Sequence, residues 1–234
     1  MFVNVTIPVF NEEVRLSRCL PRLHRFLTGQ SRFDFEIVIA DNGSTDETLK
    51  IARELCLQHD GTRVLRLDRK GRGRAVKRAW FESQADILSY MDVDLSTDLT
   101  AFPPLIEALM GGGFDVATGS RLLEPSLTTR SWKRELISRC YNRLIKVMFR
   151  TRFSDAQCGF KALTRRVVDD VVPDVVDEAW FFDSELLIRA EQRGYRIFEV
   201  PVGWIEDLDS RVKIVRTAWE DMKGLIRIRF SRSS

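Results

Sequence analysis

The sequence has few of the residues that build disulfides, zinc sites or membrane spans. Its 234 residues include only two histidines, and its four cysteines lie far apart without a Cys-x-x-Cys pair. This argues against a zinc site, and scattered free thiols are typical of a reducing compartment. No apolar run approaches the roughly 18–20 residues that cross a bilayer, and the N-terminal segment reaches acidic residues too early for a signal peptide. We therefore expect a cytoplasmic protein whose membrane contact is peripheral, on the inner face.

The charge of the chain is nearly balanced overall but unevenly distributed. Lys and Arg number 37 against 34 Asp and Glu, and the basic residues gather in 63–78, 121–152 and 211–232. Such clusters indicate an anionic partner: phosphate, a lipid surface or nucleic acid. No Pro-, Gly- or Ser-rich linker and no internal repeat divides the sequence. We expect one domain over residues 1–210, followed by a basic amphipathic segment over 211–234.

Short β-rich runs alternate with helical patterns through the first half of the chain. Strands are predicted at 2–10, 35–40, 63–67, 87–91 and 114–117. Helices are predicted at 12–27, 46–58, 73–84 and 103–110. This alternation predicts an α/β fold with a mainly parallel sheet covered on both faces, which binds its ligands beyond the carboxyl ends of the strands. Polar clusters follow four of these strands, at 11–13, 41–44, 92–94 and 119–121, and we expect them to form one site.

The second half of the chain adds longer helices. Residues 132–149 predict a basic amphipathic helix with an apolar side of Leu136, Ile137, Leu144, Ile145 and Met148. A loop with Asp155 and Cys158-Gly159-Phe160-Lys161 is expected next, then a helix with WFFDSELLIRA, a strand at 195–202 and a last helix from about 211. The last helix places Val215, Ala218, Trp219, Met222, Leu225 and Ile226 at helical spacing between Lys and Arg residues. That pattern is typical of a membrane-surface helix, alone or paired with 132–149, and packing against the domain is the alternative.

Two aspartates, Asp92 and Asp94, end the apolar run at 87–91. Carboxylates without His or thiolate favour Mg²⁺ or Mn²⁺, which proteins hold through one or two carboxylates plus substrate phosphates. An ordinary solvated loop is the alternative for so short a motif. A calcium loop is excluded, because Thr97 and Pro103 stand where it needs Gly and Glu. A phosphatase that uses Asp92 as its nucleophile stays open, although such enzymes normally carry the motif after their first core strand.

Two further loops are suited to a nucleotide. In 41–46 (DNGSTD), Gly43 allows a tight turn and the Ser, Thr or last Asp can cap the next helix, whereas Asp41 can accept hydrogen bonds from a base or ribose. Lys70 and Gly71 precede a helix whose first N–H groups suit a diphosphate, with a solvated basic turn as the alternative. The basic loop lacks the P-loop pattern and the interleaved aromatics of a nucleic-acid patch, so no nucleic-acid partner is expected.

Six segments in this order resemble one known family: IPVFNEE, ADNGSTDETL, DVDLS, GSR, DAQCGFKAL and WFFDSELL. They are similar to the GT-A glycosyltransferases of the polyprenyl-phosphate sugar synthase kind, which include dolichyl-phosphate mannose and dolichyl-phosphate glucose synthases. The resemblance covers residues 3 to about 210, and QCGFK is more similar to the glucose-type branch. It implies an inverting enzyme that moves a hexose onto polyprenyl phosphate, with UDP-glucose preferred over GDP-mannose as the donor. The oligomeric state stays open.

The resemblance also implies roles for particular residues. It assigns the nucleotide-sugar pocket to Pro8, Asn11, Glu12, Asp41, Lys70, Gly71 and Asp92, and the Mg²⁺ or Mn²⁺ ion to Asp92 and Asp94. Ser96 replaces a Gln that binds the metal in some relatives, which leaves that ligand to water, and Asp98 is left to cap or solvate the next turn. The acceptor phosphate falls to Arg121, Arg134 and Ser138, and orientation of the sugar or phosphate to Asp155. Asp183, preferred over Glu185, is a further candidate.

This set of residues implies a simple chemistry. A lipid phosphate monoester is largely dianionic at neutral pH, so it can attack the anomeric carbon of the sugar without a strong general base. Catalysis then depends on orienting two anions and on neutralising the departing nucleoside diphosphate.

Overall fold

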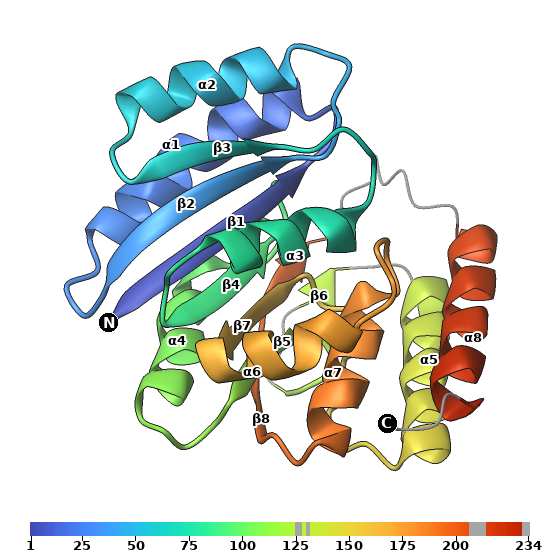
Figure 1. The fold of residues 1–234 in the computed structure, drawn as a ribbon. Coiled ribbons are helices and arrows are strands. Elements are labelled where there is room, and N and C mark those ends of the chain that lie inside the picture. The colour runs from blue at the N-terminus through green and yellow to red at the C-terminus, as the bar shows by residue number, and fades with distance from the viewer. Residues whose placement is uncertain (125–127, 130–131, 206–213, 231–234) are drawn as a thin grey trace.

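The structure is a computed structural model that describes residues 1–124, 128–129, 132–205 and 214–230. Its frame is a seven-stranded sheet with strand order β3-β2-β1-β4-β7-β5-β8 (Figure 1). The strands are β1 (Phe2–Val9), β2 (Asp34–Asp41), β3 (Thr62–Arg66), β4 (Ile87–Met91), β5 (Val116–Ser120), β7 (Phe160–Thr164) and β8 (Ile197–Pro201). A separate pair, β6 (Thr128–Thr129) and β9 (Trp204–Ile205), is parallel.

Helices lie on both faces of this sheet. They are α1 (Glu13–Thr28), α2 (Thr48–Gln58), α3 (Arg72–Glu82), α4 (Phe102–Met110), α5 (Trp132–Phe149), α6 (Arg165–Val171), α7 (Phe182–Gln192) and α8 (Ile214–Phe230). Short 3₁₀ turns occur at Leu99–Ala101 and Val172–Asp174. The mainly parallel α/β sheet predicted from the sequence is confirmed.

Strand β2 shows why an apolar run forms a strand here. Its side chains alternate, so Ile37 and Ile39 pack with α1 and α2 on one face while Val38 and Ala40 pack with α3 on the other. All four are fully buried, which gives the continuous apolar pattern of a parallel strand covered on both sides. Burial of each large apolar side chain contributes about 1.5–3 kcal/mol, so the strand ends are held firmly in place.

One strand of the seven-stranded sheet was not predicted. The segment expected as a loop through Lys161 forms β7, which pairs antiparallel with both β4 and β5. The sequence FKALT carries a lysine in its middle, which hides its apolar pattern, although Lys161 is completely buried. A second correction concerns α7, which begins at Phe182, so that the half-exposed Trp180 precedes it.

Helix α8 packs against the domain and also presents apolar side chains to solvent. Its buried face carries Asp221, Gly224, Leu225 and Ile228, at spacings of three and four residues. A Cβ at Gly224 would lie 2.3 Å from the Phe181 ring, so the glycine permits a close approach of α8 to the start of α7. The opposite face exposes Trp219, Met222, Ile226 and Phe230.

Helix α5 lies beside α8 (Figure 1). Its predicted apolar side is divided, because Ile145 is buried whereas Leu136 and Ile137 are about half exposed. Over the described residues, no helix combines the length and apolar character needed to cross a membrane. The predicted division of the chain at residue 210 stays a prediction, and residues 206–213, where it falls, lie outside the described part.

Candidate active site

The ends of β1 and β2 are joined by side chains from both loops. Asn11 adopts a left-handed backbone conformation with φ of 54°. Its N–H donates to Ser44 Oγ at 3.0 Å, and its Oδ1 accepts the N–H of Thr45 at 2.8 Å. The N–H of Glu12 donates to Thr48 Oγ1 at 2.8 Å. The predicted residues Asn11 and Glu12 therefore lie beside the loop that follows Asp41, and Pro8 pairs with Ala40 in the adjoining strands.

Asp41 is completely buried at the carboxyl end of β2. Its Oδ1 accepts the N–H of Ser44 at 3.2 Å, whereas no described residue donates a hydrogen bond to its buried Oδ2. A buried carboxylate oxygen without a protein partner is rare, because lost hydration is costly. The arrangement fits a donor group on a ligand.

The loop before α3 lies beside the loop that follows Asp41. The N–H of Gly71 donates to Asn42 Oδ1 at 2.7 Å, and the N–H of Arg74 donates to the carbonyl of Glu178 at 3.1 Å. Two of the N–H groups expected to face a diphosphate thus already have protein partners. Lys70 lies with its Nζ 3.7 Å from the centre of the Phe10 ring, a cation–π contact at the exposed edge of the loop.

Arg72 connects the predicted metal motif to the interior. Its Nη2 lies 2.7 Å from Asp92 Oδ1 and its Nη1 lies 2.6 Å from Asp183 Oδ2. The guanidinium also lies 4.9 Å from the centre of the Tyr90 ring and 5.2 Å from that of Trp180. Nothing in the sequence distinguishes Arg72 from the other arginines of its loop, because only the fold brings α7 beneath it.

Asp183 is surrounded by donors. Besides Arg72 it accepts a hydrogen bond from the Tyr90 hydroxyl, and it pairs with Lys161 Nζ at 3.2 Å. Burial alone would raise the pKa of Asp183, but the charges of Lys161 and Arg72 hold it below its ordinary value. The side chain of Asp183 is 3% exposed, so it lies behind Arg72 in the wall of the site.

The acidic pair at the end of β4 fits a divalent cation. The Asp92 side chain is 39% exposed, and no described residue donates a hydrogen bond to its Oδ2. A Cβ on Gly159 would lie 1.9 Å from this oxygen, so the glycine leaves the space that it occupies. Asp94 is exposed and accepts the N–H of Ser96 at 2.9 Å. No group of three or more His, Cys, Asp or Glu is placed for a metal in the described chain, so phosphate and water oxygens would complete a shell of hard ligands.

The next turn follows the prediction for Asp98. This side chain accepts the N–H of Thr100 at 2.9 Å and caps the 3₁₀ turn, as expected for a residue outside the metal motif.

Arg121 and Asp155 form a bidentate pair at the carboxyl end of β5. Nε and Nη2 of Arg121 lie 2.7 and 2.9 Å from the two carboxylate oxygens, and the backbone N–H of Arg121 adds a third bond at 3.1 Å. Burial would raise the pKa of Asp155, but the Arg121 guanidinium outweighs it and holds the pKa below its ordinary value. The predicted acceptor arginine is therefore oriented by the predicted sugar-orienting aspartate.

The loop that carries Asp155 is fixed from several elements. Ser154 donates through its N–H and hydroxyl to Glu199 of β8, and the N–H of Ala156 donates to Asn142 of α5 at 2.9 Å. Ser138, one turn before Asn142, is buried, and its Oγ has no hydrogen-bond partner among the described residues. Arg134 belongs to α5, but its side chain lies outside the described part, so its predicted role is not placed.

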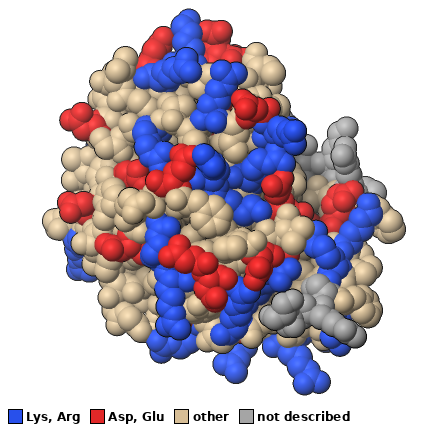
Figure 2. Space-filling view, viewed as in Figure 1, with Lys and Arg blue, Asp and Glu red and all other residues tan. Residues whose placement is uncertain are grey.

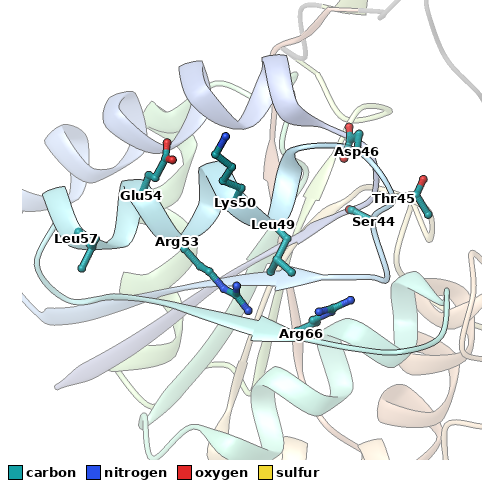
Figure 3. A pocket seen from close by; sticks show the side chains of 9 residues that line it. All are labelled: Ser44, Thr45, Asp46, Leu49, Lys50, Arg53, Glu54, Leu57 and Arg66. Atoms are coloured by element: carbon teal, nitrogen blue, oxygen red, sulfur yellow. The ribbon is translucent and has the colours of Figure 1, made fainter.

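Many of the basic residues in 63–78 are paired within the protein. Figure 2 shows Lys and Arg interspersed with Asp and Glu over the face that carries α3. Arg63 pairs with Glu36 and Arg74 with Glu178. A groove between α2 and β3 begins at the loop after Asp41 and is lined by nine residues: Ser44, Thr45, Asp46, Leu49, Lys50, Arg53, Glu54, Leu57 and Arg66 (Figure 3). Asp41 and the predicted metal ligands do not line this groove.

Comparison with known proteins identifies the class. Residues 4–172 match the family model described as Glycosyl transferase family 2. The chain is 38% identical to Glycosyltransferase AglD of Haloferax volcanii over 219 residues, which are 92% of this chain and 35% of that protein. It is 31% identical to the dolichyl-phosphate beta-glucosyltransferase of Mus musculus over 246 residues, covering 97% of this chain and 74% of that protein. The chain thus spans about a third of the archaeal relative and about three quarters of the mouse relative.

Solved structures show the same fold. Glucosyl-3-phosphoglycerate synthase of Mycobacterium tuberculosis in complex with UDP superposes with a TM-score of 0.75 at 19% identity, covering 100% of this chain and 82% of that chain. The same enzyme with Mn²⁺, UDP and glucosyl-3-phosphoglycerate gives 0.73 at 18% identity, covering 100% and 81%.

The fold and the family match define a glycosyltransferase of the GT-A type. The chain belongs to glycosyl transferase family 2. The resemblance to polyprenyl-phosphate sugar synthases is confirmed, since the relatives include dolichyl-phosphate beta-glucosyltransferases of mouse and yeast.

Proposed function

We propose that this protein transfers a hexose, glucose from UDP-glucose, onto a polyprenyl phosphate such as dolichyl phosphate. The loop at 155–159 supports this function most directly, because it contacts both halves of the site. At one end Asp155 holds Arg121, and at the other Gly159 lies against Asp92. A donor diphosphate at Asp92 and an acceptor phosphate at Arg121 would then meet across a single short loop. The relatives named for dolichyl-phosphate glucosylation support the same substrates.

On the donor side, the Oδ2 of Asp41, which has no partner among the described residues, accepts a hydrogen bond from the base or ribose. Asp92 and Asp94 would hold Mg²⁺ or Mn²⁺ on the diphosphate. When bound, such an ion neutralises the charge of the departing nucleoside diphosphate. Arg72 supplies a second positive charge beside Asp92, and Asp183 fixes its position from behind.

On the acceptor side, the phosphate binds at Arg121. Asp155 fixes one edge of the guanidinium, so its orientation is set before the phosphate arrives. A phosphate oxygen forms the new bond to the anomeric carbon while the bond from that carbon to the diphosphate oxygen breaks, which inverts the configuration. The phosphate is already dianionic at neutral pH, so the step needs no strong general base.

The test uses Asp92→Ala and Asp94→Ala in the full chain. Both variants should lose sugar transfer from UDP-glucose to polyprenyl phosphate in the presence of Mg²⁺ by at least about 100-fold, because the departing diphosphate loses its counter-charge. Thermal melting of Asp94→Ala should stay close to that of the parent, since the Asp94 side chain is exposed. In Asp92→Ala the Arg72 guanidinium keeps its ion pair with Asp183, so this variant should still fold. Transfer at the parent rate by the double variant would contradict the proposed metal site.

Two further measurements on the same protein test the alternatives, which are a GDP-mannose donor and a phosphatase activity. Thermal-shift measurements with UDP-glucose and GDP-mannose, each with and without Mn²⁺, identify the donor, because the tighter ligand raises the melting temperature more. Hydrolysis of a simple aryl phosphate that disappears in Asp92→Asn would instead support the phosphatase hypothesis.

We also propose that α8 and α5 contact a membrane surface peripherally. The exposed residues Trp219, Met222, Ile226 and Phe230 repeat at intervals of three and four residues, and Leu136, Ile137 and Val147 are exposed on α5. Flotation with vesicles that contain anionic lipids should weaken at least about tenfold in Trp219→Glu/Phe230→Glu. Leu57→Glu, which changes an exposed leucine on α2, is the matched control. Equal flotation of both variants would contradict this surface. A location on the inner face of a membrane stays a prediction.

A further inference from the structure

One residue of α8, Asp221, contacts the loop at 155–159. Asp221 is 3% exposed, and its Oδ2 accepts a hydrogen bond from Gln157 Nε2 at 2.9 Å. Its Oδ1 is buried, and no described residue donates a hydrogen bond to it. Because a buried carboxyl with one unsatisfied oxygen costs stability, the residue is poorly explained by packing alone.

Gln157 continues the connection toward the substrate. Its backbone N–H donates to Asp155 Oδ1 at 3.1 Å, and that oxygen also receives Nη2 of Arg121 at 2.9 Å. A chain of three hydrogen-bonded contacts therefore runs from α8 to the arginine that we assign to the acceptor phosphate. Each link lies within or against the short loop at 155–159.

The rest of α8 packs against the domain on one side and faces solvent on the other. Toward the domain, Gly224 lies against the Phe181 ring and Arg227 donates to the buried carboxylate of Glu185. Toward solvent, Trp219 lies two residues before Asp221 and Met222 directly after it, and they are 62% and 37% exposed. A shift of the helix would therefore move Asp221 relative to Gln157.

The charges around the Asp221 carboxyl group indicate that this residue does not serve stability alone. Burial raises the pKa of Asp221 to about 7, and the carboxylates of Asp177 and Asp183 add to the effect. On α5, burial raises the pKa of Tyr141 well above its ordinary value, the charge of Asp221 adds to this effect, and the Tyr141 hydroxyl donates to Ser184. The first two cations of α8 that follow Asp221 in the sequence are both paired, Lys223 with Glu220 and Arg227 with Glu185. A strongly shifted acid near a site is a common property of functional groups.

We propose that Asp221 is a positioning residue that couples the seating of α8 to the Asp155–Arg121 pair through Gln157. The inference rests on the glycosyl transfer proposed above. In this arrangement Asp221 fixes the Gln157 side chain, Gln157 orients Asp155, and Asp155 presents Arg121 to the acceptor phosphate. The position of α8, and hence its contact with a surface, then sets how well Arg121 is presented.

The experiment is a double-mutant cycle in the full chain. Asp221→Ala and Gln157→Ala should each lower kcat about five- to tenfold, as expected for one lost hydrogen bond, and the double variant should be no slower than either. The KM for the nucleotide sugar should stay within about twofold, because the donor half of the site is untouched. Asp221→Asn retains an acceptor oxygen for Gln157, so it should keep more than about half of the parent kcat.

Controls separate positioning from general stability. Glu220→Gln changes the neighbouring exposed carboxylate on α8, which pairs only with Lys223 among the described residues, and should leave kcat unchanged. If Asp221→Ala does not fold, Gln157→Ala and Asp221→Asn decide the matter, because the first removes the same bond from the loop side and the second preserves it. Multiplied effects in the double variant, or parent activity in Gln157→Ala, would overturn the proposal.

A second readout does not depend on sugar transfer. Hydrogen exchange at the backbone amides of Arg121 and Gln157, both bonded to Asp155, should be faster in Asp221→Ala than in Glu220→Gln by at least about fivefold. A parent protein that transfers no sugar would overturn the proposed function, and the exchange rates would still test the coupling. Equal exchange rates in the two variants would contradict the proposed coupling of Asp221 to Asp155, without contradicting the proposed glycosyl transfer.

Discussion

Arg121 holds Asp155 through a fork of two hydrogen bonds, with Nε 2.7 Å from Oδ2 and Nη2 2.9 Å from Oδ1. The two side chains are 14% and 0% exposed, so the pair is largely withdrawn from water. A planar guanidinium on a planar carboxylate has little rotational freedom, and its direction is fixed by the end of β5. The arginine proposed for the acceptor is thus held rigidly while retaining its charge.

Asp155→Asn should be strongly destabilising as well as inactive. The amide offers Arg121 a single acceptor and no charge, which leaves a mostly buried guanidinium uncompensated. Breaking a buried pair in this way costs about 3–5 kcal/mol. Urea unfolding measures the loss, and sugar transfer by the remaining folded protein should fall at least about 100-fold.

The matched control for this change is Glu135→Gln. Glu135 pairs with Arg139 one helical turn later on α5, where the two side chains are 36% and 58% exposed. An exposed pair of this kind contributes about 0.3–0.5 kcal/mol, so stability should hardly change. Equal unfolding curves for Asp155→Asn and Glu135→Gln would show that the Asp155 pair has no structural role.

Gly159→Ala tests the space beside the metal motif. A Cβ at this position would lie 1.9 Å from Asp92 Oδ2 and 2.7 Å from Arg72 Nη2, so both side chains must move. Transfer should fall about 10- to 100-fold because a displacement of about 1 Å at the reacting groups has that effect. Gly113→Ala is the control, since its Cβ would meet no atom within 4 Å. A Gly159→Ala enzyme as active as Gly113→Ala would contradict the proposed donor site.

Features formed by residues that are close together in the sequence could be predicted from it. The apolar run at 87–91 and the aspartates after it are contiguous, so strand β4 was predicted residue for residue. The turn at 41–46 was predicted on the same basis, and Asp46 does accept the N–H of Thr48 at the start of α2. Such features depend on neighbours in the sequence.

Contacts between residues that are far apart in the sequence could not be predicted from it. Arg72 and Asp183 are separated by 111 positions, and nothing within either segment indicates the other. Strand β7 was not predicted because Lys161 interrupts its apolar pattern. Only the fold brings Asp183 close to Lys161 as its ion-pair partner. A lysine inside a short apolar run was nevertheless a usable sign, since a buried lysine requires an acid nearby.

Arg72→Gln should change the metal dependence of the reaction in a particular direction. Arg72 provides the positive charge that Asp92 contacts, so its removal should lower the Mg²⁺ concentration needed for half-maximal activity. The maximal rate should fall at least about tenfold, because the second charge beside the diphosphate is lost. Titration of transfer rates with Mg²⁺ measures both values. Arg78→Gln, which removes an exposed arginine that pairs with Glu82 on α3, is the control.

The Asp221 side chain should make a contribution to stability that falls as the pH rises from about 4 to about 7. Its folded pKa of about 7 lies above the ordinary 3.8, so between these values the folded protein holds a proton that the unfolded chain has lost. Proton loss therefore favours unfolding through this window, and the effect levels off above pH 7. Asp221→Asn does not titrate, so the variant should gain about 2 kcal/mol relative to the parent between pH 5 and pH 8.

Urea unfolding of the parent, Asp221→Asn and Glu220→Gln at several pH values tests this sign. The other acids are common to all three proteins, so the difference between the curves isolates the one side chain. Glu220→Gln, on the exposed side of the same helix, should follow the parent at every pH. A stability difference between Asp221→Asn and the parent that shrinks as the pH rises would mean that the folded protein favours the ionised carboxylate. In that case the Oδ1 of Asp221 must have a donor partner, and Asp221 would hold α8 by charge rather than as a neutral hydrogen-bonding group.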